Sequence, residues 1–296
     1  MNASRVDSLL WNNKTIYIKR DDLLDSYFSG NKYRKLYYYL CQKNLNYSQI
    51  LSYGGIQSNA MLSMAALAHE KSLPFIYFTR YLPKGLSLDL ESNYSKALAL
   101  GMEIKIHPAN SDEALRDYLL SYYDKQTLFI PQGAASSQAQ YGIEVLAQEI
   151  MQWKKEQSID NLTVATPSGT GTTALWLQNY LVKENITVLT TAAVGDESYL
   201  KQQMQRLNPR ALLPLILKTE KKYTFAKPNV VLYKQYQSFL EKGIKFDLIY
   251  APVMWQALQE NQNLWANSTL LYIHSGGVMG NESQLLRYEK ILKANH

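Results

Sequence analysis

The stretch QILSYGGIQSNAMLSMAALAHEK, residues 49–71, decides the fold. Residues 49–53 are mostly apolar and include a β-branched and an aromatic side chain, which predicts a short buried strand. Gly54 and Gly55 close this strand. Residues 58–71 then place methionines and alanines at helical spacing. A strand that passes through a glycine turn into a helix predicts one unit of a parallel α/β sheet.

The same alternation recurs along most of the chain. Strands are predicted at 15–19, 49–53, 75–78, 103–107, 128–130, 161–166, 187–193 and 270–273. Helices are predicted at 32–43, 58–71, 94–100, 113–122, 141–155 and 173–183. Repeated units of this kind indicate an α/β fold with mostly parallel sheets and helices on both faces. Because the units are too many for one half-sheet, we expect two wound domains with a cleft between them.

Composition excludes several classes of protein. The chain has 296 residues, of which 46% are apolar, and 31 Lys and Arg against 25 Asp and Glu give a formal net charge of +6. The apolar share excludes wholesale disorder. The single cysteine, Cys41, excludes an internal disulfide framework and a multi-cysteine metal site. Since residues 1–10 show no secretory signal and no apolar run reaches about 18 residues, we expect a cytoplasmic protein without a membrane span.

Ligands of such sheets bind beyond the carboxyl ends of the strands, where glycine-rich turns enter helices. Four turns fit this description: Ser-Gly-Asn-Lys at 29–32, Gly-Gly-Ile-Gln-Ser-Asn at 54–59, Ser-Gly-Thr-Gly-Thr-Thr at 168–173 and His-Ser-Gly-Gly at 274–277. Each turn has both a structural interpretation and a functional one.

The turn at 168–173 predicts a phosphate site. It consists of Ser168, Gly169, Thr170, Gly171, Thr172 and Thr173. Its glycines let the backbone approach a ligand, and the unpaired amides and dipole at the start of the next helix favour an anion. The loop matches neither the nucleoside-triphosphate motif nor the dinucleotide fingerprint. The alternative is a helix that simply follows a tight turn.

The other turns carry reactive or polar side chains. Lys32 stands at the mouth of a helix, where the dipole lowers its pKa and favours the neutral amine that Schiff-base chemistry needs. The alternative is a solvated basic face of Lys32, Arg34 and Lys35. Ser58 or Asn59 either caps a helix or binds a substrate carboxylate and a cofactor hydroxyl.

The last turn offers one ligand group and one structural side chain. Ser275 could present its hydroxyl to a ligand, whereas His274, alone beside a strand, is expected to be structural rather than catalytic. No metal site is predicted at any of the four turns.

Six motifs together resemble a known family. They are Lys-Arg-Asp-Asp at 19–22, Gly-Asn-Lys-Tyr-Arg-Lys-Leu at 30–36, the turn at 54–59, Ile130-Pro131-x-Gly133 with Gly142, and the turns at 168–173 and 274–277. From about Lys19 to Gly277 the chain resembles 1-aminocyclopropane-1-carboxylate deaminase and D-cysteine desulfhydrase, which are pyridoxal-phosphate enzymes. The resemblance implies two three-layer αβα domains of the tryptophan-synthase-β type, known as fold type II.

That resemblance also implies an organisation and a reaction. A larger cofactor-binding domain would comprise 1–46 plus 141–296, and a smaller domain, 47–140, would cover the cleft. The activity would be a deaminating α,β-elimination on a small amino acid, such as D-cysteine or 1-aminocyclopropane-1-carboxylate. The chain is expected to be a homodimer.

The resemblance assigns a role to each turn. Lys32 would hold pyridoxal 5'-phosphate covalently and later move the α-proton of the substrate. Ser58 would bind the substrate carboxylate and assist proton transfer, with Gln57 and Asn59 beside it. Asn59 would also bond the ring hydroxyl of the cofactor and Ser275 would face its pyridine nitrogen, while the loop from Ser168 to Thr173 would hold its phosphate.

Two tyrosines of the family are replaced here. Phe225 and Met254 stand at their positions, and Trp255 stands where deaminases have a glutamate. Phenylalanine and methionine cannot exchange a proton. The candidates to replace the lost phenols are Tyr53, Tyr223 and Tyr250, a choice that the sequence leaves open.

Two alternative functions remain. A family member without these phenols could catalyse a different reaction of an amino acid, as a racemase or another lyase. A nucleic-acid-binding protein would be the alternative of another class, because residues 37–39 are three tyrosines beside Arg34 and Lys35. Consecutive residues of a helix point in different directions, which counts against this third hypothesis.

Overall fold

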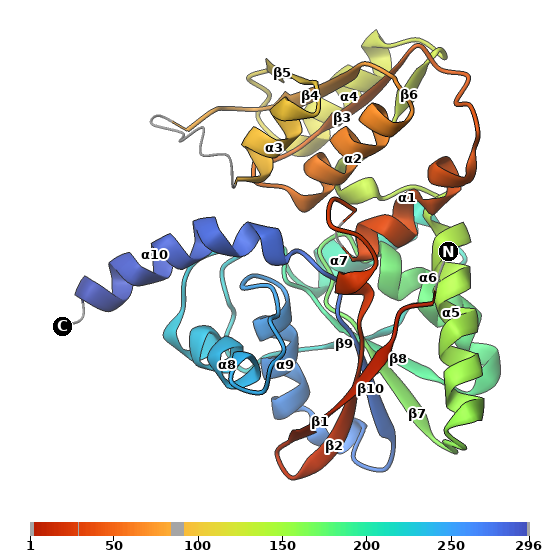
Figure 1. The fold of residues 1–296 in the computed structure, drawn as a ribbon, viewed down its shortest axis with the longest axis vertical. Helices are drawn as coiled ribbons and strands as arrows, with labels where there is room; N and C mark the ends of the chain where they lie inside the picture. Colours follow the sequence, from red (N-terminus) through yellow and green to blue (C-terminus); the bar gives the residue numbers. More distant parts are fainter. Residues whose placement is uncertain (1–2, 29, 84–91, 295–296) are drawn as a thin grey trace.

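The computed structural model describes residues 3–28, 30–83 and 92–294. Ser29, the first residue of the predicted turn at 29–32, lies outside this range. Two sheets, one above the other in Figure 1, organise the chain.

The larger sheet has six strands in the order β1 (Val6–Trp11), β2 (Lys14–Lys19), β10 (Thr269–Ile273), β7 (Leu162–Ala165), β8 (Thr187–Thr191) and β9 (Leu215–Leu217). The smaller sheet has four in the order β5 (Met102–Ile106), β4 (Phe75–Thr79), β3 (Gln49–Tyr53) and β6 (Thr127–Phe129). Only the β1–β2 pair is antiparallel. The predicted α/β fold with mostly parallel sheets is therefore confirmed.

Ten helices of the described chain surround these sheets. They are α1 (Asn31–Cys41), α2 (Asn59–Glu70), α3 (Asn93–Ala99), α4 (Asp112–Tyr122), α5 (Ala139–Glu156), α6 (Thr172–Leu181), α7 (Glu197–Leu207), α8 (Val230–Leu240), α9 (Ala251–Glu260) and α10 (Asn281–Ala294). Short 3-10 turns occur at Asp21–Leu23, Gln132–Ala134, Val182–Glu184, Gln262–Leu264 and Val278–Gly280. None of the helices in the described ranges is long and apolar enough to span a bilayer.

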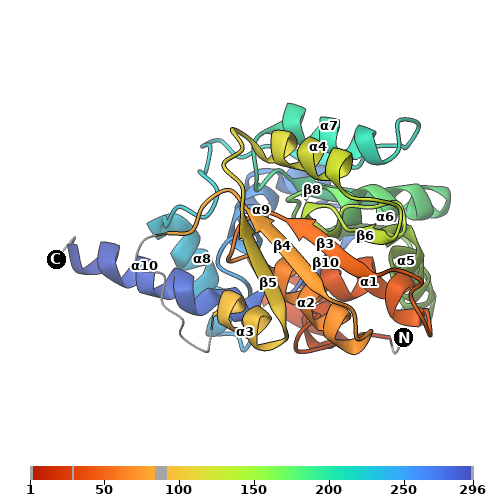
Figure 2. The same ribbon diagram turned by 90° about the horizontal axis from the view of Figure 1, so that it is seen from above.

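Each sheet is covered on both faces, which gives three layers per sheet. In the smaller sheet Ile50 packs with α2 and α3 while its neighbour Leu51 packs with α4, because adjacent strand residues point to opposite faces. Figure 2 shows this sheet between α4 and the pair α2 and α3. The larger sheet packs with α5, α6 and α7 on one face and with α8 and α9 on the other.

The predicted strands and helices are present, and most of their ends agree with the structure to within one or two residues. The antiparallel hairpin of β1 and β2 was not predicted. Strand β1 turns into β2 through Asn12 and Asn13, which have positive φ angles of 48° and 60°. Asparagine tolerates this conformation, so the pair is a hairpin signal that the prediction overlooked. Strand β9 and helices α7 to α10 were also not predicted.

The domain limits 1–46 plus 141–296 and 47–140 stay a prediction. The larger sheet takes its strands from 6–19 and 162–273, and the smaller one from 49–129. Helix α1 contacts both α5 and α2, so it lies at the junction between the two groups of elements.

A cluster of four buried charges fixes α1 in place. Arg34 of α1 binds Asp21 at 2.8 Å and Glu149 of α5 at 2.6 Å, and Lys19 at the end of β2 binds Glu149 at 2.6 Å. The hydroxyl of Ser4 donates to Asp21. Burial alone would lower the pKa of the Arg34 guanidinium, but the two carboxylates raise it above its usual range. The two positive and two negative charges neutralise each other. Because removal of one member leaves a buried charge without its partner, the cluster is stable only as a whole.

Replacing one member of this cluster should destabilise the fold. Glu149→Gln leaves Lys19 and Arg34 with a single carboxylate, and we expect a loss of roughly 3–5 kcal/mol of unfolding free energy. Urea denaturation followed by circular dichroism measures this loss. Glu156→Gln, an exposed position on the same helix, is the matched control and should change stability by no more than about 0.5 kcal/mol. Equal effects of the two substitutions would contradict the proposed importance of the cluster.

Candidate active site

The turn that carries Lys32 is locked onto the turn at 274–277. Gly30 precedes α1 with a φ of 49°, and a Cβ at this position would lie 2.1 Å from the carbonyl oxygen of Ser275. The backbone N–H of Asn31 donates to that same oxygen at 3.0 Å. Only glycine allows such a close approach, so two turns far apart in the sequence meet at the start of α1.

The amine of Lys32 is poised to be neutral. The residue is half-buried, and its Nζ donates to Asn31 Oδ1 at 2.7 Å. Desolvation lowers the pKa of Lys32 to about 8, although the nearby carboxylate of Asp247 raises it. The sequence predicted a lowered pKa from the helix dipole, whereas burial is the larger cause. The alternative of a solvated basic face is wrong, because Arg34 and Lys35 are both buried.

A second amine, that of Lys35, reaches the predicted phosphate loop. Its Nζ donates to the carbonyl oxygen of Gly133 at 3.1 Å and lies 3.4 Å from Thr170 Oγ1. Burial lowers the pKa of Lys35, and the charge of Lys32 lowers it further. The prediction missed this residue as a site residue. The three-residue spacing from Lys32 was the available signal, since it places both side chains on one helix face.

The loop at 168–173 is held from beneath by the larger sheet. Ser168 Oγ lies 2.7 Å from Thr190 Oγ1, and the Thr170 and Thr172 hydroxyls are 2.9 Å apart. Gly171, with a φ of 75°, begins α6 and packs so closely on Met204 that a Cβ would lie 2.6 Å from its methyl group. Among the described residues the buried hydroxyl of Thr173 has no partner. An unsatisfied donor at the start of a helix suits an anionic guest.

The turn at 54–59 has a confirmed capping role. Ser58 Oγ accepts the backbone N–H groups of Ala60 and Met61 at 3.2 and 3.4 Å, as an N-cap residue does. Asn59 Oδ1 accepts from Asn93 of α3 at 2.8 Å. Gln57 is exposed, and its carbonyl oxygen accepts from the same Asn93 side chain. The functional roles of all three residues stay predictions.

Asn59 and Ser275 face the meeting point of the turns. The Nδ2 atom of Asn59 lies 2.8 Å from the point that a Cβ at Gly277 would occupy, so this side chain packs directly on the turn at 274–277. Ser275 Oγ lies 3.3 Å from Thr166 Oγ1, just before the phosphate loop. Residues 30–32 and the turns at 54–59 and 274–277 are therefore linked by direct contacts, and Thr166 connects Ser275 to the segment that leads into the loop at 168–173.

His274 is structural, as predicted. Its ring stacks on Phe246 with centroids 4.5 Å apart. Its Nδ1 accepts from the backbone N–H of Gly276 at 3.2 Å, so the proton is on Nε2, which donates to the carbonyl oxygen of Lys245 at 2.9 Å. Burial lowers the pKa of this imidazole, which favours its neutral form. Both ring nitrogens therefore stay hydrogen-bonded to backbone groups.

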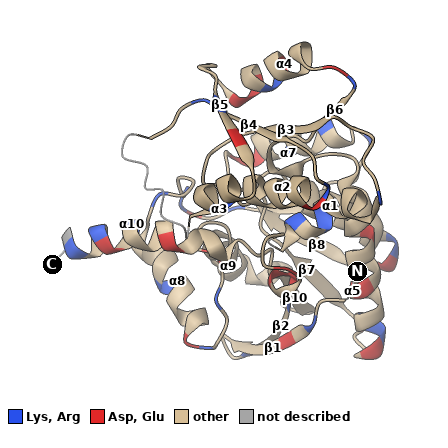
Figure 3. Ribbon diagram, turned by 45° about the horizontal axis from the view of Figure 1, so that its top comes forward, with Lys and Arg blue, Asp and Glu red and all other residues tan. Residues whose placement is uncertain are grey.

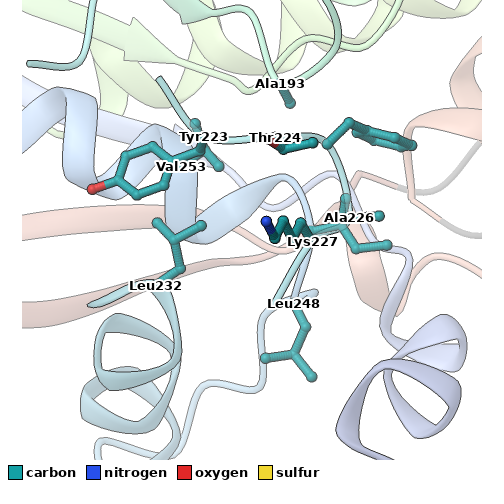
Figure 4. Close-up of a pocket in the computed structure, with 10 residues that line it drawn as sticks. Ala193, Tyr223, Thr224, Ala226, Lys227, Leu232, Leu248 and Val253 are labelled. Carbon is teal, nitrogen blue, oxygen red and sulfur yellow. The ribbon is translucent and has the colours of Figure 1, made fainter. Parts of the chain in front are cut away.

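Two of the three residues that replace family side chains point away from the turns. Met254 and Trp255 are fully buried in the core beside Phe239. Phe225 is partly exposed and packs against Tyr250, with ring centroids 5.7 Å apart. Figure 4 shows the small cavity that residues 223–227 line together with Ala193, Leu248 and Val253. Ala193 donates its backbone N–H to the carbonyl oxygen of Ser168, so the cavity adjoins the loop at 168–173.

The nucleic-acid hypothesis gains no support from the surface. Tyr39, one of its three tyrosines, is buried in the core. In Figure 3 basic and acidic residues alternate along α5 and α10 instead of forming a continuous basic face on these helices. Within the described ranges, no group of three or more His, Cys, Asp and Glu could hold a metal ion.

The donors around the loop at 168–173 fit a phosphate-bearing aldehyde. They are the amine of Lys35, the free hydroxyl of Thr173 and backbone amides at the start of α6. Lys32, with its lowered pKa, lies on the same helix as Lys35 and could react with a carbonyl group. Pyridoxal 5'-phosphate combines these two features.

Comparison with known proteins supports the same family. No family model matches the chain. A Thermotoga maritima protein with a provisional 1-aminocyclopropane-1-carboxylate deaminase name is 26% identical over 291 residues, which cover 90% of this chain and 89% of that protein. The bifunctional D-cysteine desulfhydrase/1-aminocyclopropane-1-carboxylate deaminase of Arabidopsis thaliana is 24% identical over 297 residues. The aligned residues cover 91% of this chain and 74% of that protein.

The fold agrees with solved structures. The crystal structure of a 1-aminocyclopropane-1-carboxylate deaminase homologue superposes with a TM-score of 0.75 at 21% identity, over 97% of this chain and 94% of that one. The predicted resemblance is thus confirmed: the chain is similar in sequence to the 1-aminocyclopropane-1-carboxylate deaminase and D-cysteine desulfhydrase proteins, and it has the tryptophan-synthase-β-like fold of pyridoxal-phosphate enzymes of fold type II.

Proposed function

We propose that the chain is a pyridoxal-phosphate-dependent enzyme that deaminates a small amino acid by α,β-elimination. The observation that carries this proposal is the convergence of Lys32, Lys35 and the loop at 168–173 beside the turn at 274–277. D-Cysteine, which has an α-proton and a β-leaving group, is the substrate to test first for this reaction. 1-Aminocyclopropane-1-carboxylate has no α-proton and would be deaminated by ring opening, so it is tested beside D-cysteine as a second substrate; the names of the curated relatives contain both. By the same resemblance we propose a homodimer, and from the composition and residues 1–10 we propose a cytoplasmic location.

The residues of the four turns would hold the cofactor. When bound, pyridoxal 5'-phosphate supplies an electron sink for a substrate carbanion. The loop at 168–173 and Lys35 would bind its phosphate, Asn59 would bond the ring hydroxyl, and Ser275 would contact the ring nitrogen. A hydroxyl at that nitrogen, unlike a carboxylate, leaves it largely unprotonated, which tempers carbanion stabilisation and suits elimination more than transamination.

Lys32 and Ser58 would act on the substrate. Lys32 would bind the cofactor covalently and, once released, its amine would take the proton from the α-carbon of a substrate such as D-cysteine. The hydroxyl oxygen of Ser58 accepts two backbone N–H groups, and its proton would be donated to the substrate carboxylate. Gln57 and Asn59 would complete the carboxylate site at the start of α2.

A second candidate function is another reaction of a pyridoxal-phosphate enzyme, such as a racemisation. The replacement of both family tyrosines, at Phe225 and Met254, favours it, because the deaminase uses those phenols over the substrate. Release of pyruvate from D-cysteine supports the elimination, and release of 2-oxobutyrate from 1-aminocyclopropane-1-carboxylate would support deamination by ring opening. Exchange of the substrate's α-proton without a 2-oxo acid product would support the alternative.

Substitution of Lys32 tests the central assignment. The purified protein with pyridoxal 5'-phosphate should absorb near the edge of the visible range, and borohydride should abolish this band. Lys32→Ala should lack the band and lower turnover by at least about 100-fold, because a positioned proton-transfer group is lost. Lys43→Ala, at an exposed position, is the control. Persistence of the band in Lys32→Ala would show that another amine binds the cofactor.

The lowered pKa of Lys32 makes its reactivity depend on pH. Only the neutral amine attacks an aldehyde, so reductive methylation of Lys32 should rise with pH and reach half of its plateau near pH 8. A lysine in water titrates at about 10.4. Peptide mass spectrometry follows each lysine, and the exposed Lys125 provides an internal reference. A midpoint for Lys32 at the value of a free lysine would contradict the desolvation of its amine.

A further inference from the structure

The lost family phenols raise the question of which tyrosine contacts the bound ligand. Tyr53, Tyr223 and Tyr250 are the sequence candidates. Their surroundings differ enough to separate them.

Tyr53 and Tyr223 face away from the turns. Tyr53 stacks on Phe129 at 5.9 Å and lies in the core beneath α4, on the opposite face of the smaller sheet from α2. In Figure 4 the hydroxyl of Tyr223 points away from the segment at 224–227. Burial raises the pKa of Tyr223, and the carboxylates of Glu260 and Glu220 raise it further, so its ring lies towards acidic neighbours.

Tyr250 lies on the phosphate loop. A Cβ at Gly169 would lie 3.3 Å from Cε1 of the Tyr250 ring and 3.6 Å from its hydroxyl oxygen. Gly169 therefore provides the room that the phenol occupies. The hydroxyl makes no hydrogen bond to another residue within the described ranges.

The backbone around Tyr250 is held rigidly. The carboxylate of Asp247 accepts the backbone N–H groups of Ile249, Tyr250 and Ala251, the last at 3.1 Å, just where α9 begins. Phe225 packs against the ring of Tyr250. The phenol is thus fixed between an aromatic neighbour and the loop at 168–173.

We propose that the hydroxyl of Tyr250 donates a hydrogen bond to the phosphate group that the loop at 168–173 binds. This inference rests on the proposed function, because pyridoxal 5'-phosphate supplies that phosphate. Burial and the charge of Asp247 raise the pKa of Tyr250, so the phenol stays protonated and acts as a donor. Lys35 contacts Thr170 of the same loop, and the phosphate would thus have an amine and a phenol among its partners.

Two aldehydes, one with and one without a phosphate group, distinguish a contact with the phosphate from a contact with the rest of the ligand. Dissociation constants of pyridoxal 5'-phosphate and of pyridoxal, which lacks the phosphate, are measured by absorbance for the wild type, Tyr250→Phe and the control Tyr223→Phe. Tyr250→Phe keeps the ring and should weaken pyridoxal 5'-phosphate binding roughly tenfold, as loss of a hydrogen bond to a charged group does. Pyridoxal binding should not change. Tyr223→Phe should bind both aldehydes like the wild type.

Four results would overturn the proposal. Tyr250→Phe could bind pyridoxal 5'-phosphate as tightly as the wild type, or it could lose affinity for both aldehydes equally, which would place the phenol elsewhere on the ligand. An equal loss of affinity for pyridoxal 5'-phosphate in Tyr223→Phe would indicate that the effect is not specific to the hydroxyl of Tyr250. Failure of the wild type to bind pyridoxal 5'-phosphate would refute the proposed function itself, and the phosphate contact with it.

Discussion

The buried charges around Arg34 hold together the part of the structure on which the site depends. Arg34 joins α1 to Asp21 and to Glu149 of α5, and Lys19 ties the same carboxylate to the end of β2. Since Lys32 precedes Arg34 by two residues, the cluster determines where the reactive amine stands. The Lys-Arg-Asp-Asp motif at 19–22 thereby gains a physical meaning, because two of its members supply the charges that orient α1.

Desolvation gives the site its chemistry. Lys32 and Lys35 lie one helical turn apart, and burial lowers the pKa of both amines. Packing between glycine turns produces this burial, since Gly30 allows the backbone of Ser275 to approach α1. The carboxylate of Asp247 raises the pKa of Lys32 and so opposes the effect of burial. The resulting pKa, about 8, lies near the range in which a general base works.

The departures from the family have a structural consequence. Met254 and Trp255 contribute to the aromatic core under the larger sheet, where the Trp255 ring stacks on Tyr272 at 4.2 Å. Tyr250 and Lys35 of α1 place polar groups beside the loop at 168–173.

The sequence by itself determined the α/β alternation, most element limits and the four glycine turns, because strand and helix periodicity and glycine positions are local properties. It also indicated that His274 is structural, whereas the choice of Ser58 over Asn59 as the cap of α2 came from the structure. The hairpin of β1 and β2 has a local signal, the asparagine pair Asn12 and Asn13, which the prediction overlooked. Lys35 as a site residue and the choice of Tyr250 over Tyr53 and Tyr223 depend on contacts between residues far apart in the chain, and on the burial that follows, so only the tertiary structure decided them.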